Sequence, residues 1–463
     1  MPKAFSGGER TWRPSTSYTD PGMMQQRRIL KAMAVWSVTD STKLRGILTD
    51  LEKQIDRLST IQPRTRSTPS TTMQTIATVS GTLLSLDQLG VNPVAADSGS
   101  NSAQQQLSTL RAMRRLKAKL ESPGPGQGSV TDLYIPQAEY HIGYNETSAT
   151  NFALGSFSKA LDGPSIEVVI EWKNYLGTDP DAKKLALSRT ELIASLLASP
   201  NKPSSFRTLD CVGWFLEEHR HRCGLLFRLP CPTTPNLQPL RLVSLAELIR
   251  SKIKPSLADR VRLAFLLSYS LLELHLSEWL HKSFTASNIL FFVVQDPKDK
   301  TAHDWIQRVD LTQPYVASFG TARPDSSFYQ SEPACKVMMV EAEYRHPAYV
   351  AGIGHVQGEQ TQRVLQPRYH RAFDVYSLGC VLLEVCTWMS LKSMGWNTAY
   401  AAAPHTWREQ LKSVARKNLP FMVGPVMMEV VVRCLGVGLD LDGEVDLEGF
   451  CWEVVERIDK VRV

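Results

Sequence analysis

Three segments of the chain carry polar side chains of the kinds that hold nucleotide phosphates and their metal ions. Lys173 follows a β-branched run, Ile166–Trp172, that predicts a strand, and Glu191 lies 18 residues further on (191 − 173) in a predicted helix. A strand lysine paired with a helix glutamate can contact phosphate oxygens. Asn288, in the segment His281–Leu290, could supply an amide oxygen to Mg²⁺. Taken alone, the lysine and the glutamate are more typical of a solvated surface.

The segment His281–Leu290 resembles the catalytic loop of protein kinases, H-R-D-L-x-x-x-N-[IL]-L, with its histidine, asparagine and closing apolar pair in register. The catalytic aspartate, which accepts the proton of the substrate hydroxyl, is replaced by Ser283. A second segment, Val316–Arg323, resembles the metal-binding stretch built around D-F-G, and its aspartate is replaced by Ser318. A serine hydroxyl brings no charge to Mg²⁺ or to the transition state. The two serines therefore predict a kinase-like fold with little or no phosphoryl transfer.

Other parts of the nucleotide site are altered as well. No glycine-rich G-x-G-x-x-G loop precedes Lys173, and Thr285 stands where many kinases carry a phosphate-contacting lysine. We therefore expect no cofactor, with at most weak ATP binding. Lys173, Glu191 and Asn288 are interpreted as possible remnants of a nucleotide site. For Asn288 we favour a hydrogen bond to the preceding turn.

The most specific match is Phe373–Glu384, which resembles the kinase segment S-D-V-[YW]-S-[FL]-G-[VC]-x-L-x-E. The resemblance implies that Asp374 lies on a buried helix and accepts N–H groups from the loop His281–Phe284. We predict structural rather than catalytic roles for a set of residues that comprises His281, Phe319, Gly320, Asp374 and Arg433.

The segment Tyr344–Tyr349 resembles the end of the kinase activation segment, Y-R-x-P-E, with Ala348 in place of the glutamate. In kinases that glutamate pairs with an arginine near the end of the domain. Arg433 stands at a suitable place, so it needs another partner, and Glu343 is the candidate. Asp299, in the charged stretch Gln295–Lys300, is expected to be an exposed acid on a surface loop.

From about residue 140 to its end the chain is similar to a protein kinase-like domain, closest to a fungal group with degraded catalytic motifs. In that group the domain often follows a helical domain related to the prion-inhibition and propagation (HeLo) family. Residues 24–61 resemble the later helices of such a domain. The resemblance implies a membrane-directed or cell-death role, but the N-terminal helices that would carry membrane activity have no counterpart here.

Composition and segmentation divide the chain into four parts. Residues 1–22 are predicted to be disordered, 24–121 to form a helical region, 122–135 to be a protease-sensitive linker, and 136–463 to form the kinase-like domain. A strand-rich half followed by a helical half predicts an α+β class with a two-lobed, kinase-like fold, preceded by a small all-α region.

The expected elements are strands followed by helices. The strands are Ile166–Trp172, Cys211–Leu216 and Cys223–Leu229, and the helices are Leu185–Leu197, Ser244–Ser251, Ser256–Leu280, Ala372–Met389, Thr406–Lys417 and Val423–Leu435.

The bulk properties exclude few classes. The formal charge of +6 over 463 residues is mild and does not indicate nucleic-acid binding. The eight cysteines are scattered without a C-x-x-C pair, and no secretory signal is recognisable, which favours a cytoplasmic setting. No apolar run is long enough to predict a transmembrane segment.

Two further clusters were weighed as binding sites. His219, His221 and Cys223 alternate as metal ligands on one strand face could, but a solvated hairpin is favoured and no metal is expected. A basic helix face could contact an anionic lipid surface or a partner, although a solvated face is favoured; its residues are Arg111, Arg114, Arg115, Lys117 and Lys119.

Three functions remain open from the sequence. The first is a pseudokinase that acts as an interaction or signalling module with protein partners. The second is a weak or unusual ATP-dependent kinase that uses Lys173, Glu191 and Asn288 with displaced carboxylates. The third is a membrane-associated helical effector regulated by the kinase-like domain, with peripheral membrane contact through the helical region.

Overall fold

The computed structural model describes residues 133–136, 141–145, 151–158, 165–175, 180–200, 202–230, 240–294, 296, 299, 301–325, 341–354, 369–397, 400, 403–438 and 447–461. The predicted parts 1–22 and 24–121, most of the linker 122–135 and the basic face around Arg111 lie outside the described residues.

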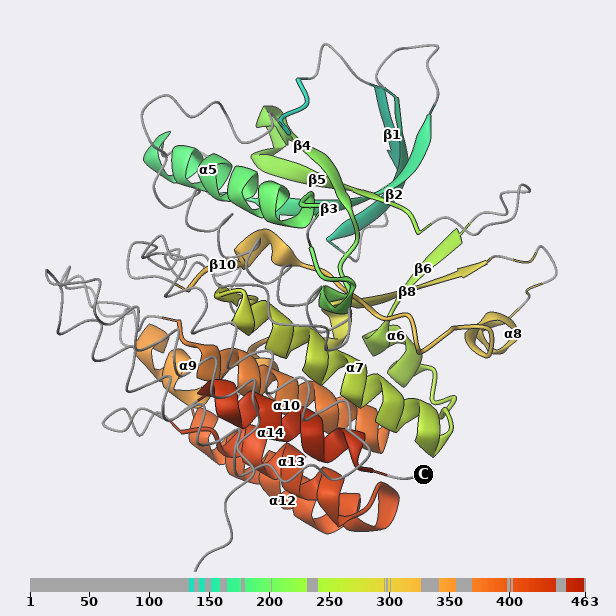
Figure 1. Cartoon of the computed structure of the whole chain (residues 1–463), viewed down its shortest axis with the longest axis vertical. Helices are drawn as coiled ribbons and strands as arrows, with labels where there is room; N and C mark the ends of the chain where they lie inside the picture. The colour runs from blue at the N-terminus through green and yellow to red at the C-terminus, as the bar shows by residue number, and fades with distance from the viewer. Residues whose placement is uncertain are drawn as a thin grey trace, which may run out of the picture. The chain divides into compact units, whose positions relative to one another are not determined.

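The first structured part is a five-stranded antiparallel sheet (Figure 1), with the strand order β1-β2-β3-β5-β4. Its strands are β1 (His141–Asn145), β2 (Phe152–Ser158), β3 (Ile166–Asn174), β4 (Cys211–Glu217) and β5 (Arg222–Arg228). The central strand β3 buries Val168 and Ile170 completely, and Trp172 and Phe215 pack edge-to-face beside them. The run of β-branched residues in β3 suits a buried strand that lies between two others in the sheet.

One helix covers this sheet. Helix α5 (Pro180–Leu197) packs against β4 and β5 through residues spaced three and four apart, among them Ala186, Ile193 and Leu197. The spacing places them on one face of the helix.

The remainder is mostly helical, with two small antiparallel sheets. The strands β6 (Leu240–Ser244), β8 (Ile289–Val294) and β9 (Tyr315–Val316) form one sheet, and β7 (Trp279–Leu280) pairs with β10 (Arg323–Pro324). The α-helices are α6 (Leu245–Arg250), α7 (Leu257–Leu276), α8 (Ala302–Ile306), α9 (Pro347–Gly354), α10 (Arg371–Thr387), α12 (Pro404–Met422), α13 (Pro425–Gly436) and α14 (Leu447–Asp459). Short 3-10 turns are η2 (Ser204–Phe206), η3 (Glu218–Arg220), η4 (Ala286–Asn288), η5 (Phe319–Thr321) and η7 (Ala342–Tyr344).

Helix α10 is the centre of the helical part. Every residue from Ala372 to Thr387 is buried, and α7, α12 and α13 pack around it. The predicted α+β class is confirmed, with antiparallel sheets. Among the described residues no helix is long and apolar enough to cross a membrane.

Several boundaries differ from the predictions; α5, for example, begins at Pro180, five residues before the predicted start at Leu185. Helix α7 ends at Leu276 rather than Leu280, because Trp279 and Leu280 pair with β10. Helix α12 continues to Met422, five residues past the predicted end at Lys417 (422 − 417). The continuation includes Pro420, which sits one turn beyond Arg416.

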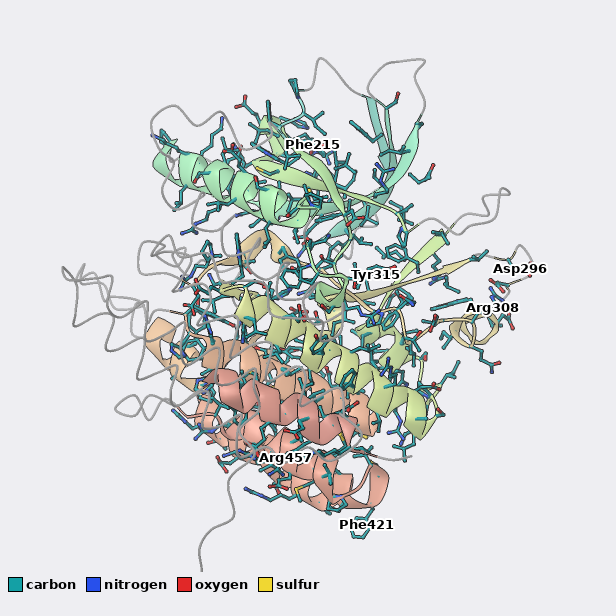
Figure 2. All side chains as sticks on the ribbon, in the orientation of Figure 1. Phe215, Asp296, Arg308, Tyr315, Phe421 and Arg457 are labelled. Atoms are coloured by element: carbon teal, nitrogen blue, oxygen red, sulfur yellow. The ribbon has the colours of Figure 1, made fainter. Side chains whose placement is uncertain are left out.

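The acid Asp299 was predicted to be exposed, and this was wrong. Its side chain is only 15% exposed, because both of its carboxylate oxygens accept from the Arg308 guanidinium. Figure 2 labels Arg308 and the neighbouring Asp296 beside α8. The Arg308 Nη2 group also donates to the carbonyl of Val294, so this arginine, two residues beyond the end of α8, ties that end to the last residue of β8 and to the stretch that follows it.

The last residues of the predicted linker belong to the sheet. Ile135 N donates to Trp214 O at 2.8 Å, and Trp214 N donates to Leu133 O at 2.8 Å, so the segment Leu133–Ile135 runs parallel to the edge strand β4. The Tyr134 and Trp214 rings lie 4.8 Å apart. Gly213 permits the close approach, since a Cβ there would lie 2.6 Å from Ile135 Cδ1.

This pairing sets the expected pattern of limited proteolysis. Cleavage of the full chain should occur before Leu133, because Leu133–Ile135 is paired with Trp214 and so cannot enter the active site of a protease. Mass spectrometry of the stable fragment should give an N-terminus within residues 122–133. A fragment beginning after Ile135 would show that the segment does not stay paired, whereas resistance throughout 122–132 would contradict the linker prediction.

Candidate functional site

The Asp374 carboxylate organises the loop that carries Ser283. Asp374 lies at the start of α10, is fully buried, and accepts from His281 N at 2.9 Å and from Lys282 N at 2.8 Å. Tyr369 Oη donates to the same carboxylate at 2.9 Å, and His275 Nε2 lies 3.2 Å from it. This confirms the prediction that Asp374 is buried and bonded to that loop.

Charge-stabilising groups outweigh burial at Asp374. Burial alone would raise the pKa of this carboxyl. The His275 ring, the charge of His281 and the His281 backbone N–H group together hold the pKa below its ordinary value. Asp374 is therefore a carboxylate at neutral pH, held in place by two consecutive N–H groups of the loop and by the Tyr369 hydroxyl.

The His281 ring joins this loop to the segment after β9. Its ring centre lies 4.7 Å from that of Phe319 and 5.5 Å from that of Phe284, both edge-to-face. All three side chains are buried. Burial lowers the pKa of His281 to about 4, so the ring is neutral at physiological pH. His281 and Phe319 therefore act in packing, as the sequence predicted.

The loop that carries Ser283 has hydroxyl groups where a catalytic loop would have a carboxylate. Ser283 Oγ lies 2.9 Å from Thr321 Oγ1, so the two hydroxyls satisfy one another. Asn288 Nδ2 donates to Ser283 O at 2.9 Å, which is the turn-stabilising bond favoured from the sequence. Thr285 Oγ1 donates to Glu341, a residue with a left-handed backbone (φ 62°) just before η7. The hydroxyls themselves supply no anionic metal ligand, and the Glu341 carboxylate beside them accepts from Thr285 and Ser287.

The structure does not bring Lys173 and Glu191 together. Lys173 is 7% exposed on β3, opposite Cys223 of β5. Glu191 is exposed on the outer face of α5, where it lines a surface groove of about 380 Å³ with Leu187 and Trp214.

The register of α5 explains this correction. Thr190, the preceding residue, is fully buried and bonds to Cys223, and each helical residue turns the side chain by about 100°. Glu191 therefore points away from the sheet.

A carboxylate that the sequence did not single out occupies the place next to Lys173. Glu171 lies two residues earlier on β3, so both side chains project from the same face of the strand. Glu171 Oε2 accepts from Ser318 N at 2.9 Å, and Oε1 accepts from Gly320 N at 2.8 Å. One side chain of the large sheet thus binds both ends of the Ser318–Gly320 segment, which has Ser318 in the left-handed region (φ 68°).

The Glu171 carboxyl is buried deeply enough to change its protonation. Burial raises its pKa to about 7, against the opposing effects of the Gly320 and Ser318 N–H groups and of the nearby Lys173 charge. Glu171 is only 2% exposed and packs closely against Gly320: a Cβ added there would be in ordinary van der Waals contact with Glu171 Oε1, at 3.6 Å. The sequence did contain a signal for this site: Glu171 lies on the same strand face as Lys173, which was expected to point inward.

Arg433 has a different partner from the one predicted. Its guanidinium forms two hydrogen bonds with Glu453 of α14, one of them at 2.7 Å, and lies over the Phe450 ring. Glu343 is instead buried beside α12, where its carbonyl accepts from Trp407 Nε1 and its carboxylate lies 3.8 Å from Lys392 Nζ. Arg433 thus joins α13 to α14, and the segment around Ala348 has no part in its ion pair.

Metal ligands do not cluster within the described part of the chain: no group of three or more His, Cys, Asp or Glu residues there could hold an ion. His219 and His221 lie in the turn between β4 and β5, and His221 has a left-handed backbone. Cys223 faces inward from β5, fully buried. The three residues do not converge.

Comparison with known families gives one match. Over residues 228–450 the chain is similar to a family described as a domain of unknown function (DUF7580). No curated protein matches the chain. The matched residues include Ser283, Ser318 and Asp374, and they leave out Glu171 and Lys173.

Asp374→Ala should destabilise the protein strongly. Three donors and a histidine would lose their buried acceptor, which we expect to cost about 3–5 kcal/mol of unfolding free energy. Denaturant unfolding followed by circular dichroism measures this loss. Glu191→Ala is the matched control, since that exposed acid should change stability by no more than about 0.5 kcal/mol. Equal, small effects of the two substitutions would show that Asp374 does not hold the loop.

Proposed function

We propose that this chain contains a two-lobed, kinase-like domain that has lost phosphoryl transfer and acts as an interaction or signalling module for protein partners. The observation that carries the proposal is the Glu171 carboxylate bound to Ser318 N and Gly320 N. It supports the proposal because the chain's own anion lies where phosphate groups would have to approach Lys173.

The electrostatic argument has two parts. First, Glu171 and Lys173 project from one face of β3, so the carboxylate offsets the lysine charge that would otherwise attract phosphate. Second, two backbone N–H groups of the Ser318–Gly320 segment already have an acceptor. A nucleotide would have to displace Glu171 and leave a buried acid without its partners, which is costly.

The missing acids support the same proposal. Phosphoryl transfer relies on a base at the substrate hydroxyl and on metal ions that offset the developing charge. Ser283 is engaged with Thr321, and Ser318 has only its backbone N–H turned to Glu171. Neither residue can supply the negative charge that Mg²⁺ prefers.

The order of the elements supports the kinase-like part of the proposal. A five-stranded antiparallel sheet with one packed helix, α5, precedes a part built around the buried helix α10. The Asp374 carboxylate at the start of α10 bonds to the loop that carries Ser283. This is the arrangement that the resemblance of Phe373–Glu384 and His281–Leu290 implies.

The alternative of a weak kinase requires a pairing of Lys173 with Glu191 that the structure does not contain. It needs Glu191 to orient Lys173, and Glu191 is exposed on the outer face of α5. The alternative of a membrane-acting helical effector rests on residues 24–121, which lie outside the described residues, so no contact in the structure favours it.

Nucleotide binding and turnover test the proposal directly. The parent chain should show no thermal shift with ATP, with or without Mg²⁺, and no transfer of phosphate to itself or to generic substrates. Glu171→Ala should gain a measurable shift with ATP, because it frees two N–H groups and Lys173. Ser283→Asp combined with Ser318→Asp should not restore full turnover, since the glycine-rich loop is also absent.

Autophosphorylation by the parent that disappears in Lys173→Met would refute the loss of transfer. The interaction part is tested in the native cell. Affinity purification should recover the same partner proteins with the parent and with Lys173→Met, and partners that depend on Lys173 would contradict a role independent of nucleotide.

Stability should depend on pH through Glu171. The folded-state pKa of about 7 lies above the ordinary 4.5, so the folded chain holds a proton that the unfolded chain releases in this window. The parent therefore loses this contribution to stability as the pH rises from 4.5 to about 7. Glu171→Gln removes the titration, so the unfolding free energy of the variant minus that of the parent should rise over the same range.

The difference between the two chains isolates Glu171. Burial raises the pKa of Glu384 to about 8 and lowers that of His281 to about 4, but these groups titrate in both chains. Denaturant unfolding at several pH values measures the difference. A value that stays constant across the window would show that the Glu171 carboxyl is not protonated on folding.

A further inference from the structure

The corner between α12 and α13 presents apolar side chains to solvent. The apolar tip, as we call it, comprises Phe421, Met422, Pro425 and Val426, of which all but the half-buried Met422 are exposed. Gly424, with a φ of 89°, makes the turn between the two helices. Figure 2 shows Phe421 pointing outward from this corner.

Phe421 differs from the other exposed apolar side chains. It is 91% exposed, whereas the other large hydrophobic residues counted as exposed in the described part reach at most 42%. A phenylalanine left in water forgoes the stabilisation that its burial would give. The backbone that holds it is firmly packed, because Leu419 and Met427 on either side of the tip are fully buried. The ring is thus displayed by a fixed corner.

Two exposed cationic residues precede Phe421 on α12. Arg416 and Lys417 are exposed, and Lys417 lies four residues before Phe421 (421 − 417), a spacing that puts both on one side of α12. At 1.5 Å per residue the Cα atoms of Lys417 and Arg416 lie about 6–8 Å from that of Phe421 along the helix axis. Neither cation forms an ion pair within the described residues.

Two acids on α12 and α13 form ion pairs with other residues. Glu429 of α13 pairs with Arg457 at 2.7 Å, and Glu409 of α12 bonds to Lys412 at 3.0 Å. Glu409 also interacts electrostatically with Arg416, but this single carboxylate lies among Arg408, Lys412 and Arg416, so the helix face keeps a net positive charge. The corner combines a protruding apolar tip with net positive charge one turn behind it.

We propose that this corner docks on the surface of a membrane that contains anionic lipids. Phe421 and Val426 enter the boundary between headgroups and acyl chains, and Arg416 and Lys417 lie at the level of the lipid phosphates. The depth of about 5–10 Å reached by interfacial side chains matches the separation of the ring from the cations. The charge of the cations complements that of an anionic leaflet.

The geometry favours a lipid surface over a protein partner. A stable protein interface buries about 800 Å² on each partner. The tip consists of four residues at a convex corner, and a fluid lipid surface can surround a single protruding ring without a shaped pocket. The proposal goes beyond the proposed loss of phosphoryl transfer and does not depend on it, since the tip shares no residue with Glu171, Ser283 or Ser318.

Vesicle flotation of the full chain tests this inference. The parent should float with vesicles of phosphatidylcholine and phosphatidylserine, less so at high salt, and should not float with phosphatidylcholine alone. Phe421→Ser should weaken binding by at least about tenfold, because the main apolar anchor is gone. Arg416→Ser and Lys417→Ser should each weaken it by about fivefold. The melting temperature should not change, since these side chains are exposed.

Lys184→Ser and Leu185→Ser on α5 are the matched controls, because they remove an exposed cation and a side chain that is 42% exposed from a different surface. Both should bind vesicles as the parent does. Flotation of Phe421→Ser equal to that of the parent would overturn the proposal, and so would a parent that binds neither vesicle. Self-association of the parent that Phe421→Ser abolishes, without vesicle binding, would assign the corner to a second copy instead.

Discussion

The buried Asp374 carboxylate is the constraint on which the helical part of the structure depends. A charge without water must be matched by donors, and here they come from His281 N, Lys282 N and Tyr369 Oη. The first two donors lie 93 and 92 residues before Asp374 in the chain, whereas Tyr369 lies five residues before it. The loop that carries Ser283 cannot move away from α10 without leaving the charge unmatched. The contacts of Asp374 use backbone N–H groups of the loop, so the position of the loop does not depend on the side chain at Ser283.

A second buried acid, Glu171, connects the large sheet to a distant segment of the chain. Glu171 binds the Ser318–Gly320 segment through both of its oxygens, and so ties β3 to the stretch that follows β9. The two acids differ in one respect. The pKa of Asp374 is lowered despite its burial, whereas burial raises that of Glu171 to about 7. The first contact is a permanent part of the fold, and the second is sensitive to protons near neutrality.

The sequence predicted those features that local pattern and fixed spacing determine. The α+β class, the burial of Asp374 and the bond of Asn288 to its preceding turn followed from periodicity and from a long motif. The pairing of Lys173 with Glu191 failed because spacing along the chain does not give the rotation of a helix. The buried stripe through Ala186, Ile193 and Leu197 held that information and placed Glu191 outside it.

Long-range partners were the least predictable. The bond between Arg433 and Glu453 joins two helices whose relative position no local pattern encodes. Glu171 reads in the sequence as an ordinary polar residue of a strand, and only its place beside an inward-facing lysine indicated otherwise. Leu133–Ile135 was assigned to a linker because prolines and glycines precede it, although an apolar Leu-Tyr-Ile run is what an edge strand needs.

That short strand has a consequence for solubility. An open β-strand edge offers unpaired N–H and C=O groups to any other extended chain and is a common start of aggregation. Trp214, in the middle of β4, has both of its outward main-chain groups taken by Leu133 and Ile135, and the Tyr134 ring packs against the Trp214 ring. Residues Leu133–Ile135 thus cover this part of the sheet edge. A fragment that begins after Ile135 would expose the main-chain groups of Trp214 and should aggregate more readily than the full chain.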